Sequence, residues 1–210
     1  MPVKTAKAAS NPYSVHPGVA MVQDWIAQLP AKTGRSLDRW LALVKKEGPA
    51  DESARRDWLK RTHGLGTNAA WWIAERSVGK GGEEDSPEAY LKAARTYVEE
   101  MFAGKKADLR PLYDELLSVG LKTGKDARAC PCKTIVPLYR NHVFAQIKPT
   151  TNTRIDLGFA LGNMKVPKRL INTGGYEKKD RITHRIEITA PQDIDAEVKR
   201  WLKTAYELDG

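Results

Sequence analysis

The pattern of apolar positions divides the chain into a helical first part and a mixed second part. Between residues 15 and 80, apolar side chains recur every three or four positions, which is typical of amphipathic helices. We expect four short helices, at residues 19–29 with Pro30 ending the first, at 37–47 after the N-cap Ser36, from Asp51 onward, and from the N-cap Thr67 onward.

The second part begins with helices and then changes its period. Ser86-Pro87 is a typical helix start, and Asp108 is the expected N-cap of the next helix. Apolar residues then recur at every second position, which predicts strands at 133–139, 142–148, 154–161 and 182–188. A last helix is expected at 193–206. The predicted fold class is α+β: a small all-α N-terminal domain, then an α+β domain whose antiparallel sheet is covered by helices on one face.

Composition places the domain boundaries. Residues 79–85 are rich in glycine and acidic residues, which is typical of a linker. We therefore predict a disordered basic tail at 1–14, a four-helix domain at 15–80, a linker at 81–85 and an α+β domain at 86–210. Five of the six tryptophans lie in the four-helix domain, where they are expected to fill a small core, and Trp71 or its neighbour should lie at the surface.

Charge and cysteine content narrow the function. The 210 residues carry 35 Lys and Arg against 26 Asp and Glu, a formal charge of +9 that favours an anionic partner. There is no apolar run long enough for a membrane helix and no secretory signal pattern, so we expect a cytoplasmic protein without a membrane partner. Cys130 and Cys132 are interpreted as reduced thiols, and we expect neither a metal nor a cofactor.

Two groups of residues are candidates for holding an anion such as nucleic acid or a phosphorylated small molecule. Lys32 and Arg35 flank the start of the second helix, where free amides and positive charge can hold phosphate. The outer face of the sheet should present Lys148, Arg154, Asp156 and Arg185, although cross-strand ion pairs on an exposed face predict the same residues. Trp71 is a candidate for stacking on a base or ring.

Two other functions remain open. An enzyme would place its pocket in the α+β domain, with Tyr139 and His184 as proton-transfer candidates and Arg154 holding the substrate, although a lone inward histidine is more often a core residue. No known catalytic motif supports this hypothesis. The third hypothesis is an adaptor that docks on another protein through an exposed tryptophan. A DNA-reading helix-turn-helix is disfavoured because TNAAWWIAERS is mostly apolar.

The segment HPGVAMVQDWIAQLPAKTGRSLDRWLALVKKEGP, with HGLGTNAAWWIAE after it, resembles the bacterial domain of unknown function family 4287. KTIVPLYRNHVFAQIKPTTNTRIDLGFALG and THRIEITAPQDIDAEVKRWLKTAYE resemble family 5655. The second region is also distantly similar to frataxin-like iron-chaperone candidates of Bacillus type. That similarity implies a clustered acidic surface, whereas residues 86–210 are net basic.

Overall fold

The computed structural model describes residues 11–210, so most of the expected tail lies outside the described residues. The described residues form two compact units, a helical unit at Val15–Ala93 and an α+β unit made of residues 11–14 and Ala94–Gly210. The division falls inside helix α5 (Pro87–Met101), while residues 81–85 lie in the turns between α4 and α5. Residues 11–14 belong to the α+β unit, where Ser14 N donates to Ala129 O at 2.9 Å.

The helical unit is built from the four helices that the sequence predicts: α1 (Gly18–Thr33), α2 (Leu37–Glu47), α3 (Glu52–His63) and α4 (Thr67–Ser77). Ser36 and Asp51 cap α2 and α3, because the side-chain oxygen of each accepts a hydrogen bond from the backbone N–H of the third residue of its helix. The apolar faces of the helices meet in one core, which contains Leu29, Trp40, Val44, Leu59, Leu65, Ala70, Ile73 and Ala74.

Two expected helix boundaries in this unit are wrong. Pro30 does not end α1, which continues to Thr33 and stops at Gly34, a residue in the left-handed conformation that glycine adopts without strain. The last turn is held by Thr33, whose hydroxyl donates to Leu29 O at 2.7 Å and accepts from Trp40 Nε1 at 2.8 Å. Thr67 is the first residue of α4 and not its cap, because Gly66 occupies the N-cap position.

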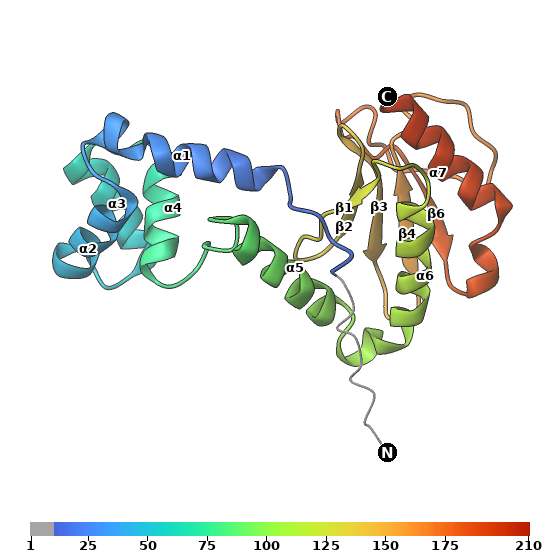
Figure 1. Cartoon of the computed structure of the whole chain (residues 1–210), viewed down its shortest axis with the longest axis horizontal. Helices are drawn as coiled ribbons and strands as arrows, with labels where there is room; N and C mark the ends of the chain where they lie inside the picture. Colours follow the sequence, from blue (N-terminus) through green and yellow to red (C-terminus); the bar gives the residue numbers. More distant parts are fainter. Residues whose placement is uncertain (1–10) are drawn as a thin grey trace, which may run out of the picture. The chain divides into compact units, whose positions relative to one another are not determined.

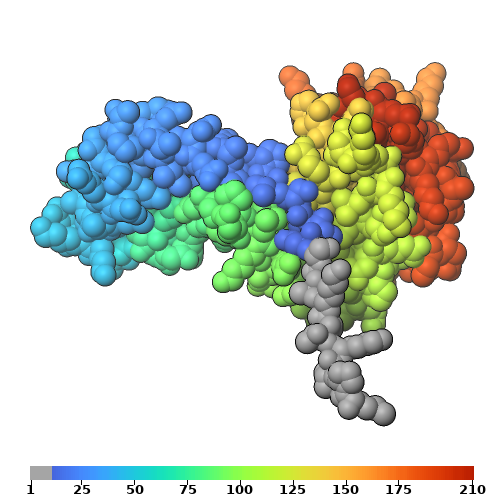
Figure 2. Space-filling view, viewed as in Figure 1, coloured from blue at the N-terminus to red at the C-terminus, as the bar shows by residue number. Residues whose placement is uncertain are grey.

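The α+β unit contains a six-stranded antiparallel sheet in the order β1-β2-β3-β4-β6-β5. Helices α6 and α7 lie side by side over one face of the sheet (Figure 1), and Figure 2 shows the same two segments next to each other on the surface. The predicted α+β class, with helices on one face of an antiparallel sheet, is confirmed. Its elements are the end of α5, η1 (Gly104–Leu109), α6 (Arg110–Leu121), β1 (Arg128–Ala129), β2 (Val136–Tyr139), β3 (Val143–Pro149), β4 (Ile155–Phe159), β5 (Ile171–Asn172), β6 (His184–Ile188), η2 (Pro191–Asp193) and α7 (Ala196–Leu208).

Three local features of this unit differ from what the sequence predicts. Asp108 does not cap a helix, because it lies within the 3-10 turn η1, and α6 begins at Arg110 with a proline in its first turn. Strands β1 and β5 have two residues each, which is too short for an alternating pattern to be visible in a sequence.

Candidate functional site

The sheet face opposite the helix-covered core carries the charged residues that the alternation predicts. The register aligns Lys148, Asp156 and Glu187 across β3, β4 and β6, with Gln146, Gly158 and Arg185 in the adjacent row. Residues of the other parity, such as Ile147, Leu157 and Ile186, are buried in the core. The outer face of the sheet therefore carries the charged residues that were predicted for it.

The arginines of this face are paired with carboxylates. Arg154 lies 3.0 Å from both Asp156 and Glu187, and Arg185 lies 2.9 Å from Asp156 and 2.8 Å from Glu187. We call these four residues the sheet network. Two guanidinium groups and two carboxylates cancel each other at short range, so the network offers little net attraction to an anion.

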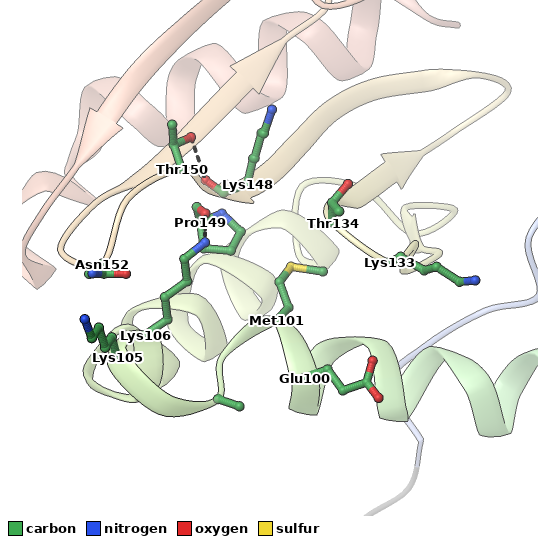
Figure 3. Close-up of a pocket in the computed structure, with 11 residues that line it drawn as sticks. Glu100, Met101, Lys105, Lys106, Lys133, Thr134, Lys148, Pro149, Thr150 and Asn152 are labelled. Atoms are coloured by element: carbon green, nitrogen blue, oxygen red, sulfur yellow. Dashed lines mark hydrogen bonds between the residues drawn. The ribbon is translucent and has the colours of Figure 1, made fainter.

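The lysine of this face has a different environment. Lys148 lines a cavity of about 530 Å³ with three further lysines, Lys105, Lys106 and Lys133, and a single carboxylate, Glu100. We call this cavity the lysine pocket. Figure 3 shows that its residues come from three places, the end of α5 with η1, the segment before β2, and the end of β3 with the turn that follows.

The lysine pocket has a buried apolar residue at its base, whereas its lysines lie near the opening. Met101 is only 8% exposed and anchors the end of α5 in the core. Lys106 extends from η1 toward β3 (Figure 3), where its Nζ donates to Pro149 O at 2.6 Å. An ammonium group has three N–H donors, so this bond leaves Lys106 with donors for a ligand. Lys133 Nζ lies 5.9 Å from the ring centre of Tyr97.

One hydrogen bond connects the lysine pocket to the sheet network. Thr150, in the turn after β3, lines the pocket and donates through its hydroxyl to Asp156 Oδ2 at 2.8 Å. Sequence reasoning identified Lys148 but missed Lys105, Lys106 and Lys133. The adjacent lysines after Gly104 were a visible signal, but the sequence does not show that η1 brings them to the end of β3.

The two cations of the helical unit that were expected to hold phosphate have different surroundings. Arg35 packs over the Trp40 ring, with its guanidinium carbon 4.8 Å from the ring centre. Lys32 lines a second cavity, beside the start of α4, and the start of α2 is already capped by Ser36. Trp71 is 43% exposed, as expected for one of the two adjacent tryptophans.

The two proton-transfer candidates lie on different strands. Tyr139 ends β2, where it pairs with Arg128 and Val143. His184 begins β6, is 4% exposed, and has Nδ1 2.9 Å from Thr183 Oγ1, which itself accepts from Leu161 N–H. Burial lowers the pKa of His184, which favours the neutral ring of a core residue.

The surroundings of Asp209 and of the two cysteines indicate structural roles. Asp209, whose side chain is almost fully buried, accepts from the backbone N–H of His142 at 2.7 Å and forms an ion pair with Arg181, which holds the end of α7. Cys130 and Cys132 are both thiols, and burial raises the pKa of the Cys130 thiol to about 12, so it stays protonated at neutral pH. In residues 11–210 no group of three or more His, Cys, Asp or Glu is arranged to hold a metal ion.

Comparison with known families gives a class without an assigned activity. A family described as a domain of unknown function, DUF5655, matches residues 98–209, and a second one, DUF4287, matches residues 21–76. The chain belongs to the DUF5655 family and carries a DUF4287 domain before it, as the resemblances in the sequence indicate. The distant similarity to frataxin-like proteins is not shown.

Nothing in the remaining comparisons adds a function. No curated protein and no solved structure matches the chain. Among the helices of residues 11–210, none has the length and apolar character to cross a membrane.

Proposed function

We propose that this protein binds a phosphorylated small molecule in the lysine pocket and acts as a binding protein without catalysing a reaction. The observation that carries the proposal is the imbalance of charge around one cavity, four lysines against one glutamate. Charge-assisted hydrogen bonds from ammonium groups are among the stronger contacts that a phosphate can make. Lysine also binds phosphate without needing the fixed two-point geometry of arginine.

The size of the lysine pocket favours a small ligand over a nucleic acid. A volume of about 530 Å³ falls within the range of about 300–1,000 Å³ typical of small-molecule sites. A nucleic acid would need a longer basic track, and the arginines that would extend the surface across the sheet are neutralised in the sheet network. The expected location of the protein is the cytoplasm, where the thiols of its two cysteines would stay reduced.

Titration calorimetry of the whole chain tests the proposal. Inorganic tripolyphosphate presents the phosphate chemistry alone, and ATP with adenosine forms a pair that differs only in phosphates. We expect tripolyphosphate and ATP to bind and adenosine not to bind, with affinity falling as ionic strength rises, because screening weakens contacts at an open rim.

Two results would contradict the proposal. One is the absence of binding by both phosphate compounds up to millimolar concentration. The other is binding of a single-stranded oligonucleotide that tripolyphosphate does not displace, which would favour the nucleic-acid partner instead.

A further inference from the structure

The helical unit contains a second cavity whose chemistry differs from that of the lysine pocket. It has a volume of about 690 Å³ and lies between the last turns of α1 and the turn that joins α3 to α4. We call it the aromatic cavity, and its walls include Trp25, Leu29, Lys32, His63, Leu65 and Asn68. Neither family description nor the proposed function assigns a role to these residues.

The indole of Trp25 is held in a fixed orientation. Trp72 packs against it edge-on, with ring centres 4.7 Å apart, and the Arg76 guanidinium carbon lies 5.2 Å from its ring centre. Arg76 is itself fixed, because its Nε donates to Asp85 Oδ1 at 3.0 Å and its Nη1 donates to Trp72 O at 3.2 Å. An aromatic wall that is already ordered costs little conformational entropy when a ligand ring packs on it.

The polar groups of the aromatic cavity favour an acid. Lys32 carries the only fixed charge among its lining residues. The first turn of α4 also lines the cavity; its N-cap, Gly66, has no side chain to accept from the helix amides, and no acidic residue lies in that turn. Free amides at this position and an ammonium group both attract a carboxylate.

A packed histidine adds to the aromatic part of the cavity wall. His63 lines the aromatic cavity and packs edge-on against Trp58, with ring centres 4.4 Å apart. Its Nε2 atom is shielded from solvent and has no hydrogen-bond partner in the described part of the chain. This nitrogen lies within the ring packing, so His63 contributes its ring to the wall of the cavity and no hydrogen bond to the proposed ligand.

We infer that the aromatic cavity binds a small aromatic carboxylate, with its ring against Trp25 and its carboxylate between Lys32 and the start of α4. The cavity volume suits a ligand with one or two rings. The inference is independent of the phosphate site, since the two cavities share no lining residue.

The test uses indole-3-acetate as the probe and indole-3-acetamide as its neutral match, titrated into the whole chain by calorimetry. We expect the acetate to bind at least ten times more tightly than the amide. Lys32→Gln should weaken acetate binding about 3- to 10-fold, whereas Lys60→Gln, which removes an exposed lysine of the same unit outside the cavity, should leave it unchanged.

A second pair of variants separates loss of binding from loss of folding. A Cβ atom at Gly66 would meet no atom within 4 Å, and the backbone there suits any residue, so Gly66→Asp and Gly66→Asn should both cap α4 and raise the melting temperature. Only Gly66→Asp places a negative charge at the proposed carboxylate position. It should weaken acetate binding more than 30-fold, and Gly66→Asn less than 5-fold.

Three outcomes would overturn the inference. They are no binding of the acetate at millimolar concentration to folded wild-type protein, equal binding of acetate and amide, and unchanged acetate binding by Gly66→Asp. A Lys105→Gln/Lys148→Gln variant should bind indole-3-acetate normally, so failure of the phosphate site and failure of this site are distinguishable.

Discussion

Two neighbouring surfaces of the α+β unit contain cationic side chains, and they differ in the number of carboxylates beside those side chains. In the sheet network, Arg154 and Arg185 each contact both Asp156 and Glu187 within 3.0 Å. In the lysine pocket, four lysines surround a cavity with one carboxylate. The contrast teaches that the number of cations in a segment says little about a binding site, because the carboxylates nearby decide how much of that charge is available to a ligand.

The largest effect should come from removing charge in the lysine pocket. In Lys105→Gln/Lys148→Gln, tripolyphosphate affinity should fall about 10- to 100-fold, since each charged contact at a partly exposed rim contributes about 1 kcal/mol. The melting temperature should stay within about 2 °C of wild type. Lys125→Gln/Lys199→Gln removes the same charge from exposed positions outside the pocket, and it should change affinity less than 2-fold. Equal losses in both variants would mean that only net charge matters.

In the sheet network, removal of a charge should lower stability and should not lower phosphate affinity. Asp156→Asn leaves both arginines with Glu187 alone and weakens the contact with Thr150, so we expect a loss of about 1 kcal/mol and a fall of about 2–4 °C in melting temperature. Phosphate affinity should not decrease. Glu187→Gln makes the same charge change at a more exposed side chain and should cost less. A large drop in affinity in Asp156→Asn would place the network within the site.

A third, smaller effect concerns pH. Burial lowers the pKa of His184, so the folded state favours its neutral ring, while the unfolded chain gains a proton near pH 6.5. The stability that depends on this ring is present above about pH 6.5 and is lost as the pH falls below it. Urea unfolding at pH 7.5 and pH 5.0 should show a smaller difference for His184→Gln than for wild type. An unchanged difference would exclude His184 as a source of the pH dependence.

The smallest effect should come from Arg35, which was expected to hold phosphate. Its guanidinium packs on Trp40 and lines neither of the two cavities. Arg35→Gln should therefore cost about 0.5–1 kcal/mol of stability and leave tripolyphosphate binding unchanged. Calorimetry and thermal melting on the same sample check both parts, and a measurable loss of phosphate affinity would restore the first expectation.

The sequence predicts most of the fold because each long element has a clear period and a local start signal. Ser36 and Asp51 mark helix starts, and the alternation in β4 places Asp156 on the outer face. The expectation at Pro30 fails because tertiary contacts of Thr33 and Leu29 hold the last turn of α1 despite the missing N–H.

The candidate site is less visible in the sequence because it is made by distant segments. Lys148 follows from strand alternation, but Lys105, Lys106 and Lys133 come close to it only because η1 and the segment before β2 lie near the end of β3. Pairing of Arg154 and Arg185 depends on the register between β4 and β6, which a single sequence does not fix.

The most direct test of the account is a two-dimensional ¹H–¹⁵N NMR titration of the whole chain with tripolyphosphate. We predict saturable shifts in the amides of residues 100–106, 133–134, 148 and 150–152, with little change at residues 154–156 and 185–187. Shifts concentrated on residues 154–156 and 185–187, or shifts scattered over all basic segments without saturation, would contradict the claim that the lysines around one cavity form the binding site.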